Sequence, residues 1–296
     1  MRIQRLLSAV ILACGVSACA KDVTGVVHPV PPLAFVRYIN AVSDTFNMDF
    51  RAVDQVTYSQ PFLNTQYRDL GNGGYQGYQA GSRHVRIFLN PAPANNTVAV
   101  DPVVVSTVMV DTTYTFVAGT YYTLLHVGNA RAGSAVKEQL MIITDALPTQ
   151  STATIQGRII NAAPTLGAVD VYVRADGTTP LSGAASASSL GFKSATTWMS
   201  QAPGAWVIRL TTPGTVVTQG AAAGYTLQVG TAGTTTLTAA PGVAPADPIF
   251  GSGQGGSIFT AVIFDASPAP VSKAAQFATP GVVYYPDMQP PRTTSP

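Results

Sequence analysis

Short runs of β-branched and aromatic residues, separated by turns rich in Gly, Pro, Asn or Ser, recur through most of the chain. No run has the 3.6-residue hydrophobic spacing of an amphipathic helix, so the pattern predicts short strands. About seven strands in each half of the chain are typical of two antiparallel sheets packed face to face. We therefore predict an all-β protein with two tandem immunoglobulin-like antiparallel β-sandwich domains. The predicted strands are 35–39, 48–50, 84–89, 103–110, 114–117, 121–127 and 140–144, then 155–160, 169–173, 196–199, 206–211, 225–229, 234–238 and 259–264.

A set of polar residues is repeated in register between the two halves, which indicates a duplicated unit. Further segments align in the same order: 81–87 with 204–210, 122–124 with 225–227, and 142–146 with 262–266. The matched polar and small residues are Arg37, Asn40, Ala41 and Asp49 in the first half, and Arg158, Asn161, Ala162 and Asp170 in the second.

The duplication and the composition of the connecting segments set the predicted domain boundaries. The segment between the two domains is short and polar, and the last segment is rich in proline. The predicted parts are a signal peptide (1–18), a Pro-containing tether (19–32), a first β-sandwich (33–147), a linker (148–152), a second β-sandwich (153–267) and a C-terminal tail (268–296). A stretch at 281–285 is a candidate strand along a sheet edge.

The first residues resemble a bacterial lipoprotein signal. Arg2 and Arg5 precede an apolar stretch, 6–13, that is too short to span a bilayer as a mature helix. Small residues then precede Cys19, the expected lipidation site, and Cys14 is a weaker alternative. Ala20 rather than aspartate follows Cys19, which favours sorting to the outer membrane. The chain is therefore expected to be lipid-anchored in the bacterial cell envelope, facing either the periplasm or the outside.

Composition narrows the possible functions. Charged residues make up only 10% of the chain, and the net charge of +2 is too small to favour nucleic acid as a partner. The two cysteines both lie in the signal region, so the folded part is expected to contain no disulfide, thiolate nucleophile or cysteine metal site. We predict no cofactor.

The repeated motif resembles the bacterial family called domain of unknown function 4397. The resemblance lies in an apolar–Arg–apolar strand followed by Asn-Ala, as at 36–41, and in the Val-Asp-Val-Tyr-Val strand at 169–173. Pro203-Gly204-Ala205-Trp206 is similar to the entry of a further strand in that family. The resemblance implies a secreted or surface-anchored β-sandwich, often in tandem copies. It implies no activity and no catalytic residues.

The polar residues of the motif are expected to be structural. Arg37 and Asp49 are expected to face each other across strands as an ion pair, while a cation site on Asp49 and Asp170 is the less favoured alternative. Asn40 and Asn161 are expected to bind nearby backbone where a strand ends.

Two further patterns give only weak evidence for a binding site. His28, His84 and His126 lack metal-ligand spacing, so no zinc site is expected. The run 251–256 formally satisfies Gly-x-Gly-x-x-Gly, but a predicted strand follows it rather than a helix, which predicts a flexible loop and no nucleotide site.

Tyr75 and Tyr78, in a Gly-rich stretch, are the candidate ligand-contact residues, because tyrosine offers an apolar ring with a polar tip. The alternative is that both rings cover the end of a sandwich. We predict a non-catalytic envelope lipoprotein, a binding or adhesion module for an unknown protein or glycan. A structural scaffold subunit is the alternative, and a carbohydrate-active enzyme with two carboxylates is less favoured.

Overall fold

The computed structural model describes residues 31–55, 61–90, 107–214, 224–226, 248–268 and 276–291. The chain divides into two units, Met1–Pro32 and Leu33–Pro296, and the fold below is that of the second unit. Several predictions lie outside the described residues: the signal peptide, Cys14, Cys19, the tether up to residue 30, and the strand expected at 234–238.

Within the described residues, eight strands form the first sandwich. One sheet has the order β4-β1-β7-β8 and the other the order β3-β2-β5-β6, and a 3-10 turn at Gly71–Gly73 precedes β4. The strands are β1 (Leu33–Asn40), β2 (Asn47–Ala52), β3 (Phe62–Thr65), β4 (Gln76–Gln79), β5 (Gly81–Asn90), β6 (Val108–Phe116), β7 (Tyr121–Val127) and β8 (Gln139–Asp145).

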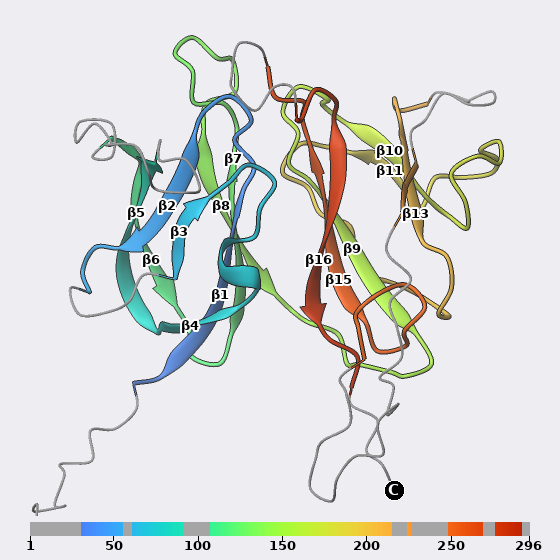
Figure 1. The fold of residues 1–296 in the computed structure, drawn as a ribbon, viewed down its shortest axis with the longest axis horizontal. Coiled ribbons are helices and arrows are strands. Elements are labelled where there is room, and N and C mark those ends of the chain that lie inside the picture. Colours follow the sequence, from blue (N-terminus) through green and yellow to red (C-terminus); the bar gives the residue numbers. More distant parts are fainter. Residues whose placement is uncertain are drawn as a thin grey trace, which may run out of the picture. The chain divides into compact units, whose positions relative to one another are not determined.

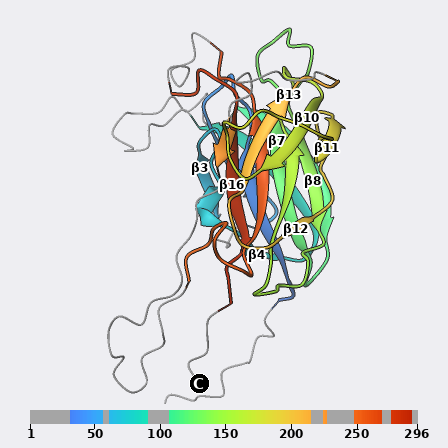
Figure 2. The same cartoon turned by 90° about the vertical axis from the view of Figure 1, so that its right-hand side faces the viewer.

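In the part of the second sandwich that the structure describes, eight more strands have the same pattern of pairing. Its sheets have the orders β12-β9-β15-β16 and β11-β10-β13-β14. Figure 2 shows β10, β11 and β13 side by side in one of these sheets. The strands are β9 (Ile155–Asn161), β10 (Val169–Arg174), β11 (Ala187–Leu190), β12 (Met199–Gln201), β13 (Val207–Thr211), β14 (Gly224–Thr226), β15 (Ile258–Phe264) and β16 (Gly281–Met288).

The predicted all-β sandwich class is confirmed, with one correction to strand direction. Most pairs are antiparallel, but β1 runs parallel to β7 and β9 runs parallel to β15. The long chain segments between these strands carry β2 to β6 and β10 to β14, and a parallel pair requires such a crossover. The sheets are therefore mixed rather than wholly antiparallel.

The described residues of the second unit pack into three hydrophobic cores. One core fills each sandwich, and a third lies between the sheets that contain β1 and β9. Strand alternation explains this arrangement: Val36 and Tyr38 on β1 enter the first core, whereas Ile39 enters the third. Figure 1 shows the β1 and β7 sheet beside the β9, β15 and β16 sheet. The two central sheets are thus covered on both faces.

The second sandwich extends beyond its predicted end at residue 267. Strand β16 lies inside the segment assigned to the tail, and it pairs along its length with β15. The candidate edge strand at 281–285 is therefore confirmed, as part of the outer strand of its sheet. Without its hydrogen bonds, β15 would be an open edge in the middle of a buried layer.

Two of the internal alignments predicted from sequence are wrong. Strand β15 pairs in parallel with β9, the first strand of its sandwich, as β7 does with β1. It therefore corresponds to β7 and not to β8. The segment at 225–227 begins in β14, which pairs with β13 and corresponds to β6. The alignment of 81–87 with 204–210 is confirmed, because β5 and β13 both pair with the strand that carries the motif aspartate.

A close approach of two strands explains one difference between the sandwiches. Gly157 on β9 occupies the position of Val36 on β1, and it lies beside Phe259, its register partner on β15. A Cβ at Gly157 would overlap the Phe259 ring. Phe259 also meets Trp206 edge-on, with ring centroids 4.9 Å apart, so the glycine makes room for an aromatic core.

Candidate functional site

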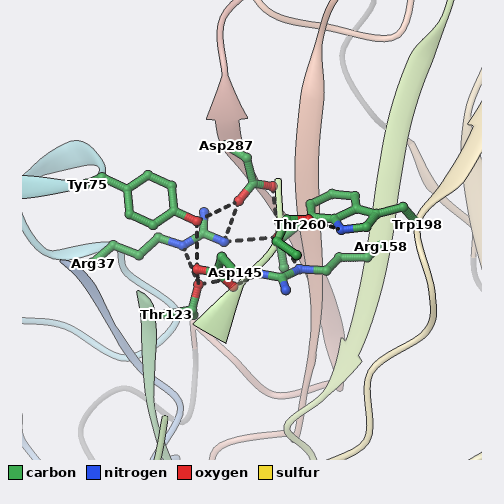
Figure 3. Close-up of polar contacts among 9 residues, drawn as sticks. Arg37, Tyr75, Thr123, Asp145, Arg158, Trp198, Thr260 and Asp287 are labelled. Atoms are coloured by element: carbon green, nitrogen blue, oxygen red, sulfur yellow. Dashed lines mark hydrogen bonds and ion pairs between the residues drawn. The ribbon is translucent and has the colours of Figure 1, made fainter. Parts of the chain in front are cut away.

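A buried cluster of polar side chains lies where the two sandwiches meet, and we call it the junction network. Figure 3 shows these side chains gathered together: the arginines and threonines lie on the central strands of the two facing sheets, the aspartates on edge strands, and the two aromatic residues just before edge strands. Each sandwich contributes an arginine, a threonine, an aspartate and one aromatic ring. The members are Arg37, Tyr75, Thr123 and Asp145 from the first sandwich, and Arg158, Trp198, Thr260 and Asp287 from the second.

Arg37 reaches from the first sandwich into the second. Its Nε donates to Thr123 Oγ1 at 2.8 Å, and its Nη2 donates to Thr260 Oγ1 at 3.0 Å. The same Nη2 lies 2.6 Å from Asp287 Oδ1, and both side chains of this ion pair are 0% exposed. Arg37 therefore joins the two sandwiches with a fully buried charge pair.

Arg158 makes the corresponding contacts in the opposite direction. Its Nε donates to Thr260 Oγ1 at 3.0 Å, and its Nη2 lies 3.5 Å from Thr123 Oγ1. The guanidinium forms an ion pair with Asp145, whose side chain is also fully buried. Each arginine is thus bound to its own sandwich through a threonine and to the other through an aspartate.

The two threonines connect the cations to the carboxylates. Thr123 Oγ1 donates to Asp145 Oδ2 at 2.7 Å, and Thr260 Oγ1 donates to Asp287 Oδ2 at 2.8 Å. A hydroxyl can donate one hydrogen bond while accepting others, so each threonine is satisfied on both sides. Such partners are what a buried ion pair needs to offset the loss of water.

Two aromatic side chains cover the arginines. The Arg37 guanidinium carbon lies 4.6 Å from the Tyr75 ring centroid, and that of Arg158 lies 4.9 Å from the Trp198 ring centroid. Tyr75 Oη lies 2.8 Å from Asp145 Oδ2 and 3.1 Å from Asp287 Oδ1. The Trp198 indole nitrogen instead donates to the backbone oxygen of Ala146 at 2.9 Å.

Electrostatics fixes the protonation state of two members of the junction network, Arg37 and Tyr75. Burial lowers the pKa of the Arg37 guanidinium, but the facing carboxylates of Asp287 and Asp145 raise it above its ordinary value overall. Burial also raises the pKa of the Tyr75 hydroxyl far above its ordinary value, against the opposing effect of Arg37. Arg37 therefore stays charged and Tyr75 stays a hydrogen-bond donor.

The predicted ion pair between Arg37 and Asp49 is wrong. Arg37 lies on β1 and Asp49 on β2, and these strands belong to different sheets of the sandwich. Asp49 instead lies 2.5 Å from Arg51 Nη2 and accepts the backbone N–H of Asn64 at 2.7 Å. Asp170 likewise accepts the backbone N–H of Ser189 at 2.6 Å.

Both aspartates hold an irregular edge of their sheet. Asn64 and Ser189 have left-handed backbone conformations, with φ of 54° and 50°. The pairing of β2 with β3 and of β10 with β11 shifts register at this point. The structural reading of the motif aspartates is therefore confirmed, although their partner is the backbone of a β-bulge.

The motif asparagines act as predicted. The backbone N–H of Val42 donates to Asn40 Oδ1 at 3.1 Å, and that of Ala163 donates to Asn161 Oδ1 at 3.0 Å. Asn161 Nδ2 also donates to Leu190 O at 2.9 Å. Each side chain thus binds backbone just after its strand, as an Asx turn does.

The two predicted ligand-contact tyrosines have different positions. Tyr78 is 0% exposed and belongs to the first core, so it cannot contact a ligand, and this part of the prediction is wrong. Tyr75 is partly buried, because its hydroxyl enters the junction network. Strand alternation places Tyr78 inward, since residues of one strand point to opposite faces in turn.

A cleft of about 450 Å³ lies beside the junction network, and Tyr75 forms part of its wall. The rings of Phe35 and Tyr121 are stacked there, with centroids 4.7 Å apart, and Tyr75 meets Tyr121 edge-on at 5.1 Å. The remaining lining comes from the turn before β4 and from the end of β16. The lining residues are Phe35, Gly73, Gly74, Tyr75, Gln76, Tyr121, Pro286, Asp287, Met288 and Gln289.

The histidines do not converge in the described part of the chain. His84 Nε2 lies 2.5 Å from Asp111 Oδ1 on an outer sheet, and His126 Nε2 lies 3.2 Å from Glu138 Oε2. His28 lies outside the described residues. Across the residues that the structure describes, no three His, Cys, Asp or Glu side chains gather as a metal site.

The Gly-rich run at 251–256 is followed by strand β15, as predicted. It is more tightly packed than the flexible loop we expected. The N–H of Gly256 donates to Thr154 O at 2.8 Å, and a Cβ at Gly255 would overlap the backbone of Thr152. This turn therefore packs against the segment that joins the two sandwiches.

Sequence reasoning missed Thr123, Asp145, Thr260 and Asp287 as a set. Three of the four could have been found as polar residues inside strongly apolar strands, where an unpaired polar group would be costly. The signal for Asp287 was weaker, because its strand was assigned to the tail.

In the described ranges there is no helix long and apolar enough to cross a membrane.

One family model matches the chain. It is that of a domain of unknown function, DUF4397, and it matches residues 34–172. The match covers the first sandwich and the first two strands of the second, and it includes both junction arginines. The resemblance inferred from the motifs is therefore supported for this segment. No curated protein matches the chain.

Proposed function

We propose that this protein is a non-catalytic binding module of the bacterial cell envelope, anchored by a lipid on Cys19. The N-terminal sequence supports the anchor: a positive start, a short apolar stretch and small residues before the cysteine. We also propose that the two sandwiches are tandem copies of the DUF4397 domain. The matching strand orders and the corresponding Arg, Thr and Asp positions support that duplication.

The observation that carries the binding role is the aromatic cleft at the junction. A site in which a ligand is to be held needs a concave surface with a few placed polar groups, and this cleft has both. The junction network beneath it supports a fixed shape, because Tyr75 is bonded to both sandwiches. Because this wall is already fixed, little conformational entropy is lost when a ligand binds.

The alternative of a glycosidase with two carboxylates is less well supported. Asp145 and Asp287 do lie close together, since both bind the Tyr75 hydroxyl. Yet their side chains are 0% exposed, and each is paired with an arginine. A substrate would have to displace these cations before it reached a carboxylate. The pair therefore supports a structural role for both aspartates.

The anchor is tested with intact cells that express the native chain, a Cys19→Ala variant and a Cys14→Ala control. Metabolic labelling with a palmitate analogue should mark the native chain and the Cys14 variant, and leave the Cys19 variant unmarked. Label that depends on Cys14 instead would contradict the Cys19 assignment. Label on none of the three would contradict the lipoprotein itself.

The binding role and a scaffold role differ in what detergent extraction yields. A binding module should be recovered as a free chain that takes up an added ligand. A scaffold subunit should be recovered in a stable complex of fixed composition, as measured by size-exclusion chromatography with mass spectrometry. Recovery in such a complex, with the cleft covered by its partner, would overturn the binding proposal.

A further inference from the structure

We propose that the junction cleft binds a neutral oligosaccharide, with a sugar ring lying against the Phe35 and Tyr121 rings. This inference rests on the proposed role as a binding module and names its ligand class.

The aromatic wall offers apolar ring surface that the core leaves partly exposed. Phe35, Tyr75 and Tyr121 are each only partly buried, whereas Tyr78 and Phe116 nearby are fully buried. Rings of this kind suit ligands that are apolar on one face and polar at their edges. A pyranose ring has this character, with C–H groups on its faces and hydroxyls at its rim.

The polar groups at the cleft favour a neutral ligand. Gln76 and Gln289 line the cleft, and their side chains are uncharged amides, which can donate and accept hydrogen bonds. Gln76 Nε2 donates to Asn72 O at 3.2 Å. Asp287 lines the cleft, but its carboxylate is buried against Arg37 at 2.6 Å. None of the lining residues therefore presents an uncompensated charge, and a charged ligand would lose its hydration without gaining a partner.

The glycine turn at one side leaves room for the ligand. A Cβ at Gly73 or at Gly74 would meet nothing within 4 Å, so this side of the cleft is open. Gly73 has a left-handed backbone, with φ of 73°, which favours glycine there. The turn therefore leaves the cleft open on this side, next to the aromatic rings.

The second sandwich lacks the same surface. Register places Gln156 where the first sandwich has Phe35, and Ile258 where it has Tyr121. Trp198, which corresponds to Tyr75, is tied to the Ala146 carbonyl across the junction. The fold is thus built without a stacked pair in the second sandwich, so the pair in the first is not a requirement of the architecture. A ligand-binding role accounts for it.

The test uses the full chain purified in detergent, with maltohexaose and cellohexaose as neutral probes and isothermal titration calorimetry as the measurement. We expect at least one probe to bind to the native chain. Tyr121→Ala should weaken that binding about tenfold, which is the size of one aromatic contact. Phe46→Ala is the matched control, since Phe46 is 50% exposed and lies outside the cleft, and it should leave binding unchanged.

A second variant guards against unfolding of the first. Gln289→Trp adds bulk at the exposed edge of the cleft without removing a core residue, and it should also weaken binding. Equal binding by the native chain and by both cleft variants would overturn the site. No binding of either neutral probe by the folded native chain would overturn the ligand class.

The binding and extraction experiments distinguish a wrong ligand class from a wrong proposed function. If a charged polysaccharide such as polygalacturonate binds, and Tyr121→Ala abolishes its binding, the sugar is not neutral but the binding module stands. If a peptide binds with the same dependence on Tyr121, the saccharide class is wrong and the module again stands. If the chain is recovered only in a fixed complex that covers the cleft, both proposals fail.

Discussion

The first sandwich covers its junction arginine with Tyr75 and the second covers its own with Trp198, while the arginines, threonines and aspartates beneath correspond. The shared residues are those that join the two sandwiches. The differing residues lie at the ends of the junction, where the cleft opens on the side of Tyr75. The comparison therefore separates what the architecture requires from what one sandwich has added to it.

The same separation explains why a buried charge network is present at all. A buried ion pair is no more stabilising than well-packed apolar residues of similar size, because both charges lose their water. It does, however, penalise any arrangement in which the partners fail to meet. Two sheets with apolar faces can slide over each other, and crossed Arg–Asp pairs favour one position. We regard the junction network as the element that specifies how the sandwiches dock.

The largest effect is expected from removing one junction arginine. Arg37→Met leaves the Asp287 carboxylate buried without its cation, so the free energy of unfolding should fall by about 3–5 kcal/mol. Arg158→Met should cost a similar amount, because Asp145 loses the corresponding partner. Denaturant unfolding of the full chain measures both. The double variant Arg37→Met with Asp287→Leu should recover a large part of the loss, since neither charge is then left alone.

The matched control is an arginine whose ion pair is exposed. Arg86 lies 2.8 Å from Asp111, with side chains that are 36% and 45% exposed, so Arg86→Met should change stability by less than about 1 kcal/mol. If Arg37→Met proved as mild as Arg86→Met, the junction network would not hold the sandwiches together. Separate unfolding transitions for the two sandwiches in the native chain would argue the same.

An intermediate effect is expected from the motif aspartates. Asp49→Ala and Asp170→Ala each leave a backbone N–H in the bulge without its acceptor, at a cost of about 1–3 kcal/mol. Asp170 also accepts the N–H of Gly214 at 3.0 Å, so its removal affects two segments. Thermal unfolding monitored by circular dichroism gives the comparison. Variants as stable as the native chain would contradict the role of these carboxylates in the bulge.

Much of the fold was predictable from the sequence because strand propensity is local. Most of the longer apolar strands, such as β1, β7 and β9, lie close to their predicted limits. The short edge strands β3 and β11 were missed, because Leu63-Asn64 and Ser188-Ser189 contain no alternating apolar pattern. Their position is fixed by the aspartate of a neighbouring strand, which is a non-local contact.

The site was less predictable than the fold, for a related physical reason. The sequence identified Arg37 and Arg158 as repeated strand residues, but it could not identify the aspartate that each meets in the other sandwich. Asp287 follows Arg37 by most of the length of the chain. Spacing within a motif predicts contacts across a turn, and it carries no information about which sheet faces which.

The smallest effect is expected where the two bulges differ in one residue. The left-handed position is occupied by Asn64 in the first sandwich and by Ser189 in the second. Asparagine adopts this conformation more readily than serine does, so Ser189→Asn should stabilise the chain by about 0.5 kcal/mol. The reciprocal variant, Asn64→Ser, should destabilise the chain by a similar amount. It also removes the hydrogen bond that Asn47 Nδ2 donates to Asn64 Oδ1, so its total effect should be somewhat larger. Precise denaturant midpoints measured on the two variants and on their combination decide the matter. If the two single variants change the free energy of unfolding in opposite directions, backbone strain at the bulge is the same in both sandwiches. If both change it in the same direction, neighbouring side chains, rather than the backbone, set the preference for asparagine or serine.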